Sequence, residues 1–166
     1  FGSSTIVIAI EAIKQNDGKY LCYTDNGREH TGIDAFEWAE KAQDLGAGEL
    51  IVTSVDKEGT GEGFDIELTR KISDAVRIPV IAHGGPGKLE HFEEIIREGN
   101  ADAVTVASMI HYDYISKNKS QGEFKGEGNV TFINSGKEFG KINKAEIMDI
   151  KKYLSEKGID CRYINE

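Results

Sequence analysis

The sequence predicts an α/β protein of four consecutive strand-helix units in a single domain. Short, continuously apolar runs rich in β-branched residues alternate with segments whose charged and apolar residues recur at helical spacing. Regular alternation with short connections favours a parallel sheet with right-handed crossovers. The length of 166 residues also suits one domain. The pattern alone fits either an open, doubly wound sheet or a closed barrel.

The parallel strands are expected in four apolar runs, at residues 5–10, 49–54, 78–82 and 103–107. Such runs are typical of strands that are covered on both faces. The helices are expected at residues 34–45, 65–76, 89–98 and 144–157. Asp34 can cap the first of these helices, with Glu37 three positions further on.

Two segments interrupt the alternation within the single domain of residues 1–166. Residues 20–24 and 29–32 are joined through Asp25, Asn26 and Gly27, which predicts a β-hairpin inserted at about residues 19–32. The second segment, at about residues 112–143, is rich in Gly, Lys, Ser and Asn and separates the fourth strand from its helix. We predict a long loop there, and loops of this length are usually functional or disordered.

The composition disfavours several classes of function. The formal net charge of −9, from 29 acidic and 20 basic side chains, argues against general binding to nucleic acid or anionic membranes. No apolar run reaches the roughly 20 residues of a membrane helix, and no signal peptide is evident, so we expect a cytoplasmic protein. Cys22 and Cys161 form no Cys-x-x-Cys pair and are interpreted as idle thiols, with no metal site. No cofactor is expected, because no Gly-x-Gly-x-x-Gly follows the first strand.

Polar and glycine residues follow the expected strands, at the edge where ligands bind in parallel α/β folds. These residues are Glu11; Asp56, Glu58, Gly59 and Thr60; His83, Gly84, Gly85, Pro86 and Gly87; and Ser108. A glycine-rich turn before a helix lets backbone N–H groups approach an anion, and the helix N-terminus adds partial positive charge. The third and fourth loops therefore predict a phosphate site, unless the glycines serve only to turn the chain.

Four segments resemble, in order and spacing, the second half of the cyclase subunit of imidazole glycerol phosphate synthase. They are residues 1–3 with 7–11, the run Thr53-Ser54-Val55-Asp56-Lys57-Glu58-Gly59-Thr60, residues 81–88, and Ala107-Ser108. The resemblance implies a (β/α)4 half-barrel, which is one half of a (β/α)8 TIM barrel. It also implies the family's reaction in histidine biosynthesis, in which ammonia from a glutaminase subunit cleaves and cyclises a ribulosyl-aminoimidazole carboxamide nucleotide. The products are imidazole glycerol phosphate and an aminoimidazole ribonucleotide.

The resemblance further implies roles for individual residues. Glu11 takes the place of a catalytic aspartate, so a carboxylate remains for acid-base work but lies one methylene further out. Thr53, Asp56 and Glu58 match substrate-binding positions, and Gly59, Gly84, Gly85, Ala107 and Ser108 match a phosphate site. Glu49 matches a gate for ammonia at the opposite end of the barrel, although by residue type alone it is a solvated carboxylate at a strand start.

The histidines receive less specific interpretations. His83 replaces a small residue of the family, where it either contacts the phosphate or fills space. The other three histidines are His30, His91 and His111. They lack metal-ligand spacing, so they are interpreted as structural or solvated.

A half-barrel has two open strand edges and an exposed apolar inner face. We therefore expect it to pair with an N-terminal half-barrel or with a second copy of itself. The chain starts almost directly on an apolar strand, so we expect it to be a piece of a longer protein that is inactive alone. The other expected partners are the glutaminase subunit and a phosphorylated small molecule. Two alternatives stay open: a relative of the cyclase that serves ammonia-dependent modification of surface-polysaccharide sugars, and an inactive phosphate-binding scaffold.

Overall fold

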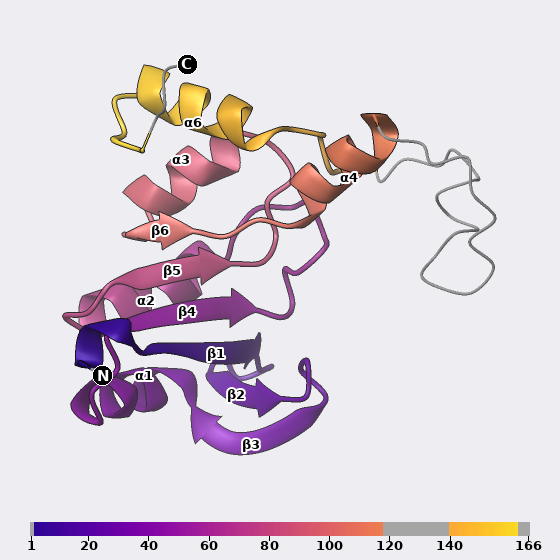
Figure 1. Ribbon diagram of the computed structural model, residues 1–166. Coiled ribbons are helices and arrows are strands. Elements are labelled where there is room, and N and C mark those ends of the chain that lie inside the picture. The colour runs from indigo at the N-terminus through magenta and orange to yellow at the C-terminus, as the bar shows by residue number, and fades with distance from the viewer. Residues whose placement is uncertain (1, 118–139, 163–166) are drawn as a thin grey trace.

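A computed structural model describes residues 2–117 and 140–162 of the chain (Figure 1). Its six-stranded sheet has the order β3-β2-β1-β4-β5-β6. The strands are β1 (Val7–Lys14), β2 (Tyr20–Thr24), β3 (Glu29–Asp34), β4 (Glu49–Ser54), β5 (Val80–His83) and β6 (Ala103–Val104). The helices are η1 (Ser3–Thr5), α1 (Ala35–Asp44), α2 (Ile66–Ala75), α3 (Glu90–Arg97), α4 (Ser108–Lys117) and α6 (Ile147–Glu156).

Four strands of the sheet, β1, β4, β5 and β6, are parallel and adjacent in chain order. A helix follows each of β4, β5 and β6, and α1 follows the hairpin that extends β1. This confirms the predicted α/β alternation, and four parallel units in sequence order are the arrangement of half a TIM barrel. All four carboxyl ends therefore lie at one edge of the sheet.

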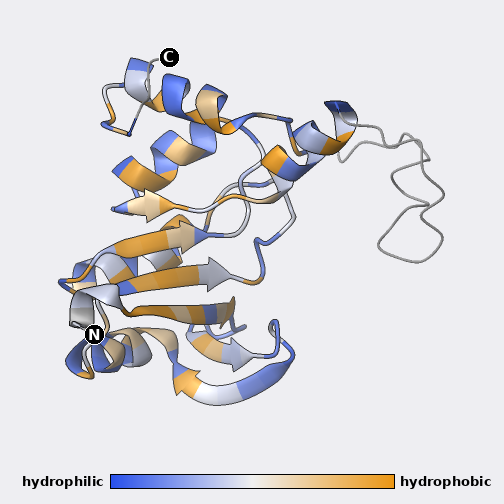
Figure 2. Ribbon diagram, in the orientation of Figure 1, coloured by the Kyte–Doolittle hydropathy of each residue, from blue (hydrophilic) through white to orange (hydrophobic). Residues whose placement is uncertain are grey.

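The two faces of the parallel strands differ in what covers them. Alternate residues such as Ile10, Leu50 and Val80 are buried, and they belong to a core cluster with residues of α1 and α2. The intervening residues face the side without helices, where Val7 keeps 49% of its surface exposed. Figure 2 shows β1, β4 and β5 as strongly apolar. The helix-free face is therefore the inner surface of a barrel that this chain does not close by itself.

A second core cluster holds the end of the chain against the last strands. It joins Phe92 of α3, Met109 of α4 and Leu154 of α6, all with 5% of their surface exposed or less. Tyr153 of α6 also donates a hydrogen bond to Glu93 of α3 at 3.0 Å. The last helix, α6, thus packs against α3 and β6 and serves as the helix of the fourth strand-helix unit.

Helix starts follow the predicted chemistry. The Asp34 carboxylate accepts from the backbone N–H groups of Phe36 and Glu37, at 2.9 and 3.3 Å, and caps α1 as expected. Asp65 caps α2 through the N–H of Leu68 at 3.0 Å. Caps of this kind fix the points at which α1 and α2 begin.

Three predicted element bounds are wrong. The first strand runs to Lys14 instead of ending at residue 10, because β2 pairs with its second half, from Glu11 to Lys14. The fourth strand pairs only over Ala103–Val104. Residues 112–117, which were expected in the long loop, belong to α4. Most of the predicted loop lies outside the described residues.

The hairpin also changes the expected edges of the half-barrel. Because β2 covers the second half of β1, only the first half of that strand is an open edge on this side. The other edge is β6. Within the described part of the chain, no helix has the length and apolarity needed to span a membrane.

Candidate active site

A pocket opens at the carboxyl ends of β4, β5 and β6. Its lining comes from three loops and the start of α4: Glu58, Gly59, His83, Gly84, Gly85, Pro86, Thr105, Val106, Ala107 and Ser108. Six of these residues, Glu58, Gly59, Gly84, Gly85, Ala107 and Ser108, are predicted site residues. The fold thus brings the whole predicted phosphate-binding set to one place.

Glycine is required in this pocket by both backbone conformation and space. Gly84 and Gly85 have φ angles of 93° and 109°, a backbone conformation that is strained for any residue with a side chain. A Cβ on Gly85 would lie 2.1 Å from the carbonyl oxygen of Gly63, whose own N–H donates to Gly85 at 2.9 Å. The loop after β5 (residues 84–87) therefore packs backbone to backbone against the loop after β4 (residues 59–63).

A third segment, residues 141–143, completes this packing. The N–H of Asn143 donates to the carbonyl of Gly87 at 2.7 Å, and a Cβ on Gly87 would lie 2.2 Å from the carbonyl oxygen of Lys141. The Lys141 ammonium forms an ion pair with Glu62 at 2.5 Å. The segment before α6 thus packs against the loops of residues 59–63 and 84–87, and it does not line the pocket itself.

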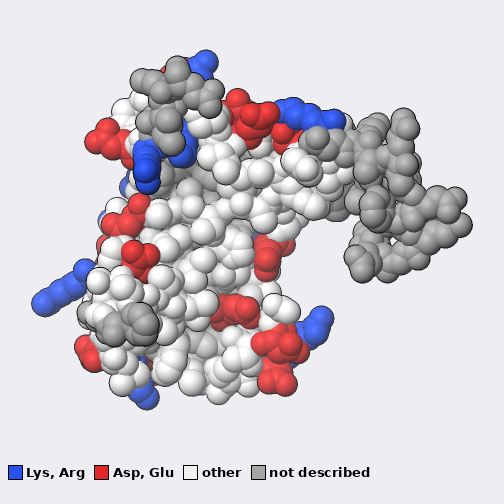
Figure 3. All heavy atoms as spheres, in the orientation of Figure 1, with Lys and Arg blue, Asp and Glu red and all other residues white. Residues whose placement is uncertain are grey.

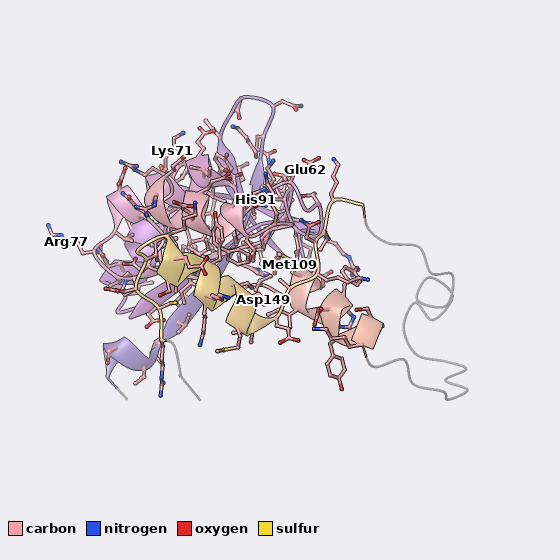
Figure 4. All side chains as sticks on the ribbon, turned by 90° about the horizontal axis from the view of Figure 1, so that it is seen from above. Glu62, Lys71, Arg77, His91, Met109 and Asp149 are labelled. Atoms are coloured by element: carbon pink, nitrogen blue, oxygen red, sulfur yellow. The ribbon has the colours of Figure 1, made fainter. Side chains whose placement is uncertain are left out.

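His91 supports the loop of residues 84–87 from the first turn of α3. Its Nδ1 accepts a hydrogen bond from the N–H of Gly87 at 3.1 Å. The residue is buried, with 6% of its surface exposed. Burial lowers the pKa of His91 below its usual value, which favours the neutral ring that this bond requires. Figure 4 shows His91 in the interior, on the side of Glu62. Its interpretation as a structural histidine agrees with this position.

Helix α4 supplies the fourth wall of the pocket. It begins at Ser108, and Met109, fully buried, anchors its first turn beside α6 (Figure 4). A helix that begins at a pocket directs N–H groups and partial positive charge toward it. Ser108, which was predicted from the sequence, lines the pocket, but the helix was missed, although the apolar and aromatic residues after Ser108 were a signal for it.

Next to the pocket, three polar residues form a row across neighbouring strands. Glu11 of β1 is paired in register with Thr53 of β4, and Thr53 with His83 of β5. Residues paired in register in a parallel sheet point to the same face, which here is the helix-free one. The hydroxyl of Thr53 and the Nδ1 of His83 are 3.0 Å apart and hydrogen-bonded. A carboxylate, a hydroxyl and an imidazole therefore lie side by side on the inner surface.

The position of Glu11 corrects one expectation. Glu11 lies inside β1 and not after its end, because the hairpin extends that strand by pairing with it. Its carboxylate accepts a hydrogen bond from the N–H of Gly27, at the hairpin turn, at 3.0 Å. A Cβ on Gly27 would lie 2.7 Å from a methyl group of Val55. The hairpin turn thus packs closely over the strand end and orients Glu11.

Two further predicted residues lie outside the pocket. The Asp56 carboxylate accepts from the backbone N–H of Lys14 at 2.8 Å, so it ties the end of β1 to the loop after β4. Glu49 is the first residue of β4 and pairs with Val7, four residues before Glu11 along β1. At about 3.3 Å per residue, Glu49 is roughly 13 Å from the level of Glu11. It is thus at the opposite end of the inner surface, as predicted.

One polar cluster was not predicted from the sequence. The Asp65 carboxylate accepts from the hydroxyls of Tyr20 at 3.1 Å and Ser54 at 3.3 Å, besides capping α2. Burial, followed by the charge of Asp65, raises the pKa of Tyr20 and keeps its hydroxyl a donor. This cluster fastens the hairpin to α2 behind the sheet and does not reach the pocket lining.

Charge around the site is mainly acidic. In Figure 3 acidic side chains gather near the carboxyl ends of the parallel strands on the visible face. Among the described residues, no three His, Cys, Asp or Glu side chains are grouped in a way that could hold a metal ion. The side chains of the site are thus a carboxylate, a hydroxyl and an imidazole in a row, next to a pocket that contains glycine loops.

Comparison with known proteins agrees with this geometry. The sequence model of a family described as "Histidine biosynthesis protein" matches residues 1–116. The chain is also similar to "Imidazole glycerol phosphate synthase subunit HisF" of Pyrobaculum aerophilum, with 41% identity over 162 residues. That match covers 98% of this chain but 51% of the relative, so the chain spans about half the length of the curated relative it matches. The chain belongs to the histidine biosynthesis protein family, and its structure is that of half of a TIM barrel.

Proposed function

We propose that this chain is the carboxy-terminal half of an imidazole glycerol phosphate synthase cyclase, a lyase of histidine biosynthesis. The pocket that Gly59, Gly84, Gly85, Ala107 and Ser108 help to line carries this proposal, because small residues from three loops meet there. A phosphate group fits such a lining, where N–H groups and the start of α4 supply positive partial charge. The 41% identity to HisF over 98% of the chain supports the same assignment.

In this proposal the reacting end of the substrate lies against the polar row of Glu11, Thr53 and His83. With the phosphate in the pocket, the rest of the substrate extends over the helix-free face, past His83 and Thr53 toward Glu11. The Glu11 carboxylate, oriented by the N–H of Gly27, is suited to move a proton as general acid or base. Thr53 lines this path, whereas Glu58 belongs to the pocket wall.

Ammonia enters from the other end in this proposal. Glu49 lies at the amino end of β4, on the same face as Glu11. A glutaminase subunit docked at that end would release ammonia next to Glu49, and the inner surface would lead it to the reacting end of the substrate. Asp56, which is held by Lys14, acts here by fixing the loop after β4 and not by contacting the substrate.

The half-barrel needs a partner to form this inner surface. In the described structure, β6 and the first half of β1 each lack a strand partner on one side. A cavity of about 490 Å³ lies beside β6 and is lined mainly by apolar residues, several of them from α3 and α6. We propose that an N-terminal half-barrel, or a second copy of the chain, covers these surfaces. Analytical ultracentrifugation of the 166-residue chain tests this, because a well-folded monomer with a dispersed NMR spectrum would refute it.

Growth and turnover test the assignment of function. The full-length protein should restore growth to a histidine auxotroph that lacks the cyclase, and its Glu11→Gln variant should not. In vitro, the full-length protein supplied with an ammonium salt should form imidazole glycerol phosphate without the glutaminase subunit. A folded protein that neither complements nor turns over would refute the assignment and favour the sugar-modifying relative. Turnover that survives Glu11→Gln would remove only the role given to Glu11.

A further inference from the structure

His83 occupies the junction between the two parts of the site. It is the last residue of β5, it lines the pocket together with Gly84 and Gly85, and it pairs in register with Thr53. No other residue belongs to both the pocket lining and the polar row within the described part of the chain. A ligand that fills the pocket and extends toward Glu11 therefore passes the imidazole.

The hydroxyl of Thr53 fixes the ring of His83. The contact at 3.0 Å involves Nδ1, so Nε2 is the nitrogen left for a ligand. A hydroxyl can donate to a neutral Nδ1 or accept from a protonated one, which makes this bond compatible with both charge states of the ring. Thr53, which is 9% exposed, is itself held in the sheet. The imidazole is therefore oriented before any ligand arrives.

The charges of the residues that line the pocket suggest a role for the imidazole of His83. Among the residues that line the pocket, Glu58 carries a negative charge, and His83 has the one side chain able to carry a positive charge. The neighbouring Lys57 does not line the pocket, and its ammonium lies 4.0 Å from Glu62. A bound phosphate would thus share its pocket with one acidic residue, whose negative charge disfavours an anion. An imidazolium at His83 would offset that repulsion.

We propose that His83 is a side-chain ligand of the substrate's phosphate group, contacting it through Nε2 while Thr53 holds Nδ1. The expected ligand class is a phosphate monoester, whose dianion benefits most from a cation beside backbone N–H groups. This inference rests on the proposed function, because it takes the pocket to be a phosphate site. It adds a side chain that can carry a positive charge to a pocket lined by several glycine and other small residues.

Two substitutions separate the two nitrogens of the ring. Asparagine places its amide near the position of Nδ1, so His83→Asn can keep a bond to Thr53 but has nothing at Nε2. Glutamine reaches the position of Nε2 without a charge. The matched control is His30→Gln, because His30 is an exposed histidine of β3 that contacts Tyr23, at 5.2 Å between rings, and not the pocket.

Inorganic phosphate is the probe, titrated into the full-length protein and followed by calorimetry at one pH and ionic strength. We expect Kd to rise about tenfold or more in His83→Asn and less in His83→Gln, with His30→Gln unchanged. With substrate, the same variants should raise KM more than they lower kcat, because a phosphate contact is made equally before and during the reaction. Circular dichroism shows whether each variant is folded.

The outcomes separate this inference from the proposed function. If the wild type binds phosphate and both His83 variants bind it equally well, the inference is wrong and the pocket stands. If the wild type does not bind phosphate at all, both are overturned. A loss of binding in His30→Gln of the same size as in the His83 variants would also contradict the inference, because the effect would then not be local.

Discussion

The mouth of the half-barrel is built in two different ways on its two sides. On the side of β4, β5 and β6, the loops of residues 59–63 and 84–87 and the segment 141–143 contact one another through backbone atoms. On the side of β1 and the hairpin, side chains make the contacts: Glu11 with Gly27, and Asp56 with Lys14. One side of the mouth is therefore held by close backbone packing of glycine loops, and the other by carboxylates that accept from backbone N–H groups. The same edge of one sheet thus has a glycine-containing pocket next to carboxylate side chains.

This difference predicts how each side responds to substitution. On the glycine side, a Cβ at Gly84, Gly85 or Gly87 would clash with backbone atoms, so substitution of these glycines should be severe. The hairpin side relies on carboxylates that accept from backbone N–H groups or buried hydroxyls, so removal of one of these should be severe there, whereas removal of an exposed ion pair should not. Four predictions test this contrast in the full-length protein.

The largest effect is expected from Gly85→Ala. The new methyl group would lie 2.1 Å from a backbone oxygen at a φ of 109°, so we expect a loss of about 3–5 kcal/mol in the free energy of unfolding. The matched control is Gly46→Ala, which has a similar φ of 100° but open space around it. Its loss should be about 1–2 kcal/mol, from backbone strain alone. Urea denaturation measures the free energy of unfolding of both variants. Equal losses would show that the close packing of the glycine loops does not contribute to stability.

The second effect concerns the cluster behind the hairpin. Asp65→Ala removes the cap of α2 and the acceptor for the buried hydroxyls of Tyr20 and Ser54, so we expect a loss of about 2–4 kcal/mol. Asp34→Ala removes a cap and no tertiary contact of this kind, and should lose about 1 kcal/mol. The same denaturation experiment compares them. If the two variants are alike, Asp65 acts only as a cap and the hairpin is held by other contacts.

The third effect is a dependence on pH. Burial lowers the pKa of His91, with Glu94 and Glu90 favouring the protonated ring and Lys88 opposing it, so the folded state binds the proton less readily than the unfolded state. Stability should therefore be unaffected by this group above pH 6.5 and should fall as the pH drops below 6.5, the ordinary value. The slope cannot exceed about 1.4 kcal/mol per pH unit for one proton.

His91→Asn isolates this contribution. Asparagine can accept from the N–H of Gly87 near the position of Nδ1 but does not titrate. We expect the stability of the wild type, measured by urea denaturation from pH 7.5 to 5, to decline relative to that of the variant. Parallel curves over this range would show that the ring of His91 is not held neutral by the fold.

The smallest effect is expected at the exposed ion pairs of the hairpin side. Glu67 contacts the ammonium groups of Lys14 at 2.6 Å and Lys71 at 2.8 Å, and these hydrogen bonds lower its pKa to about 2. All three side chains are exposed to solvent, so Glu67→Gln should change stability at pH 7 by no more than the error of measurement. Because the folded pKa is lowered, any difference from the wild type must disappear as the pH falls toward 2. A large loss at pH 7 would show that these pairs hold the hairpin after all.

The sequence predicted those features that depend on neighbouring residues. Asp25, Asn26 and Gly27 specify a turn by their own chemistry, and all three have positive φ angles in the structure. Glycines at residues 84 and 85 indicated a loop of unusual conformation, which the structure has. Local signals of this kind are carried by the residues themselves, so they need no knowledge of the rest of the fold.

The features that were missed depend on partners far along the chain. The extension of β1 beyond residue 10 requires pairing with β2, and Glu-Ala-Ile-Lys has no strong strand signal alone. The bonds from Tyr20 to Asp65 and from Gly87 to His91 appear only when the loops are placed in space. Helix α4 was missed because the polar residues that follow it made the whole stretch resemble a loop.

The alternation of side chains along the parallel strands separates two evolutionary pressures. Positions such as Ile10 and Leu50 face the helices, so their side chains are constrained by packing in the core. Their neighbours Glu11 and Ile51 face the inner surface and are free of that constraint. A combinatorial library confined to the inner-surface positions could therefore search for new substrates without disturbing the core. A single-residue deletion within β1 would exchange the two sets of positions, so gaps in these strands should be rare among functional relatives.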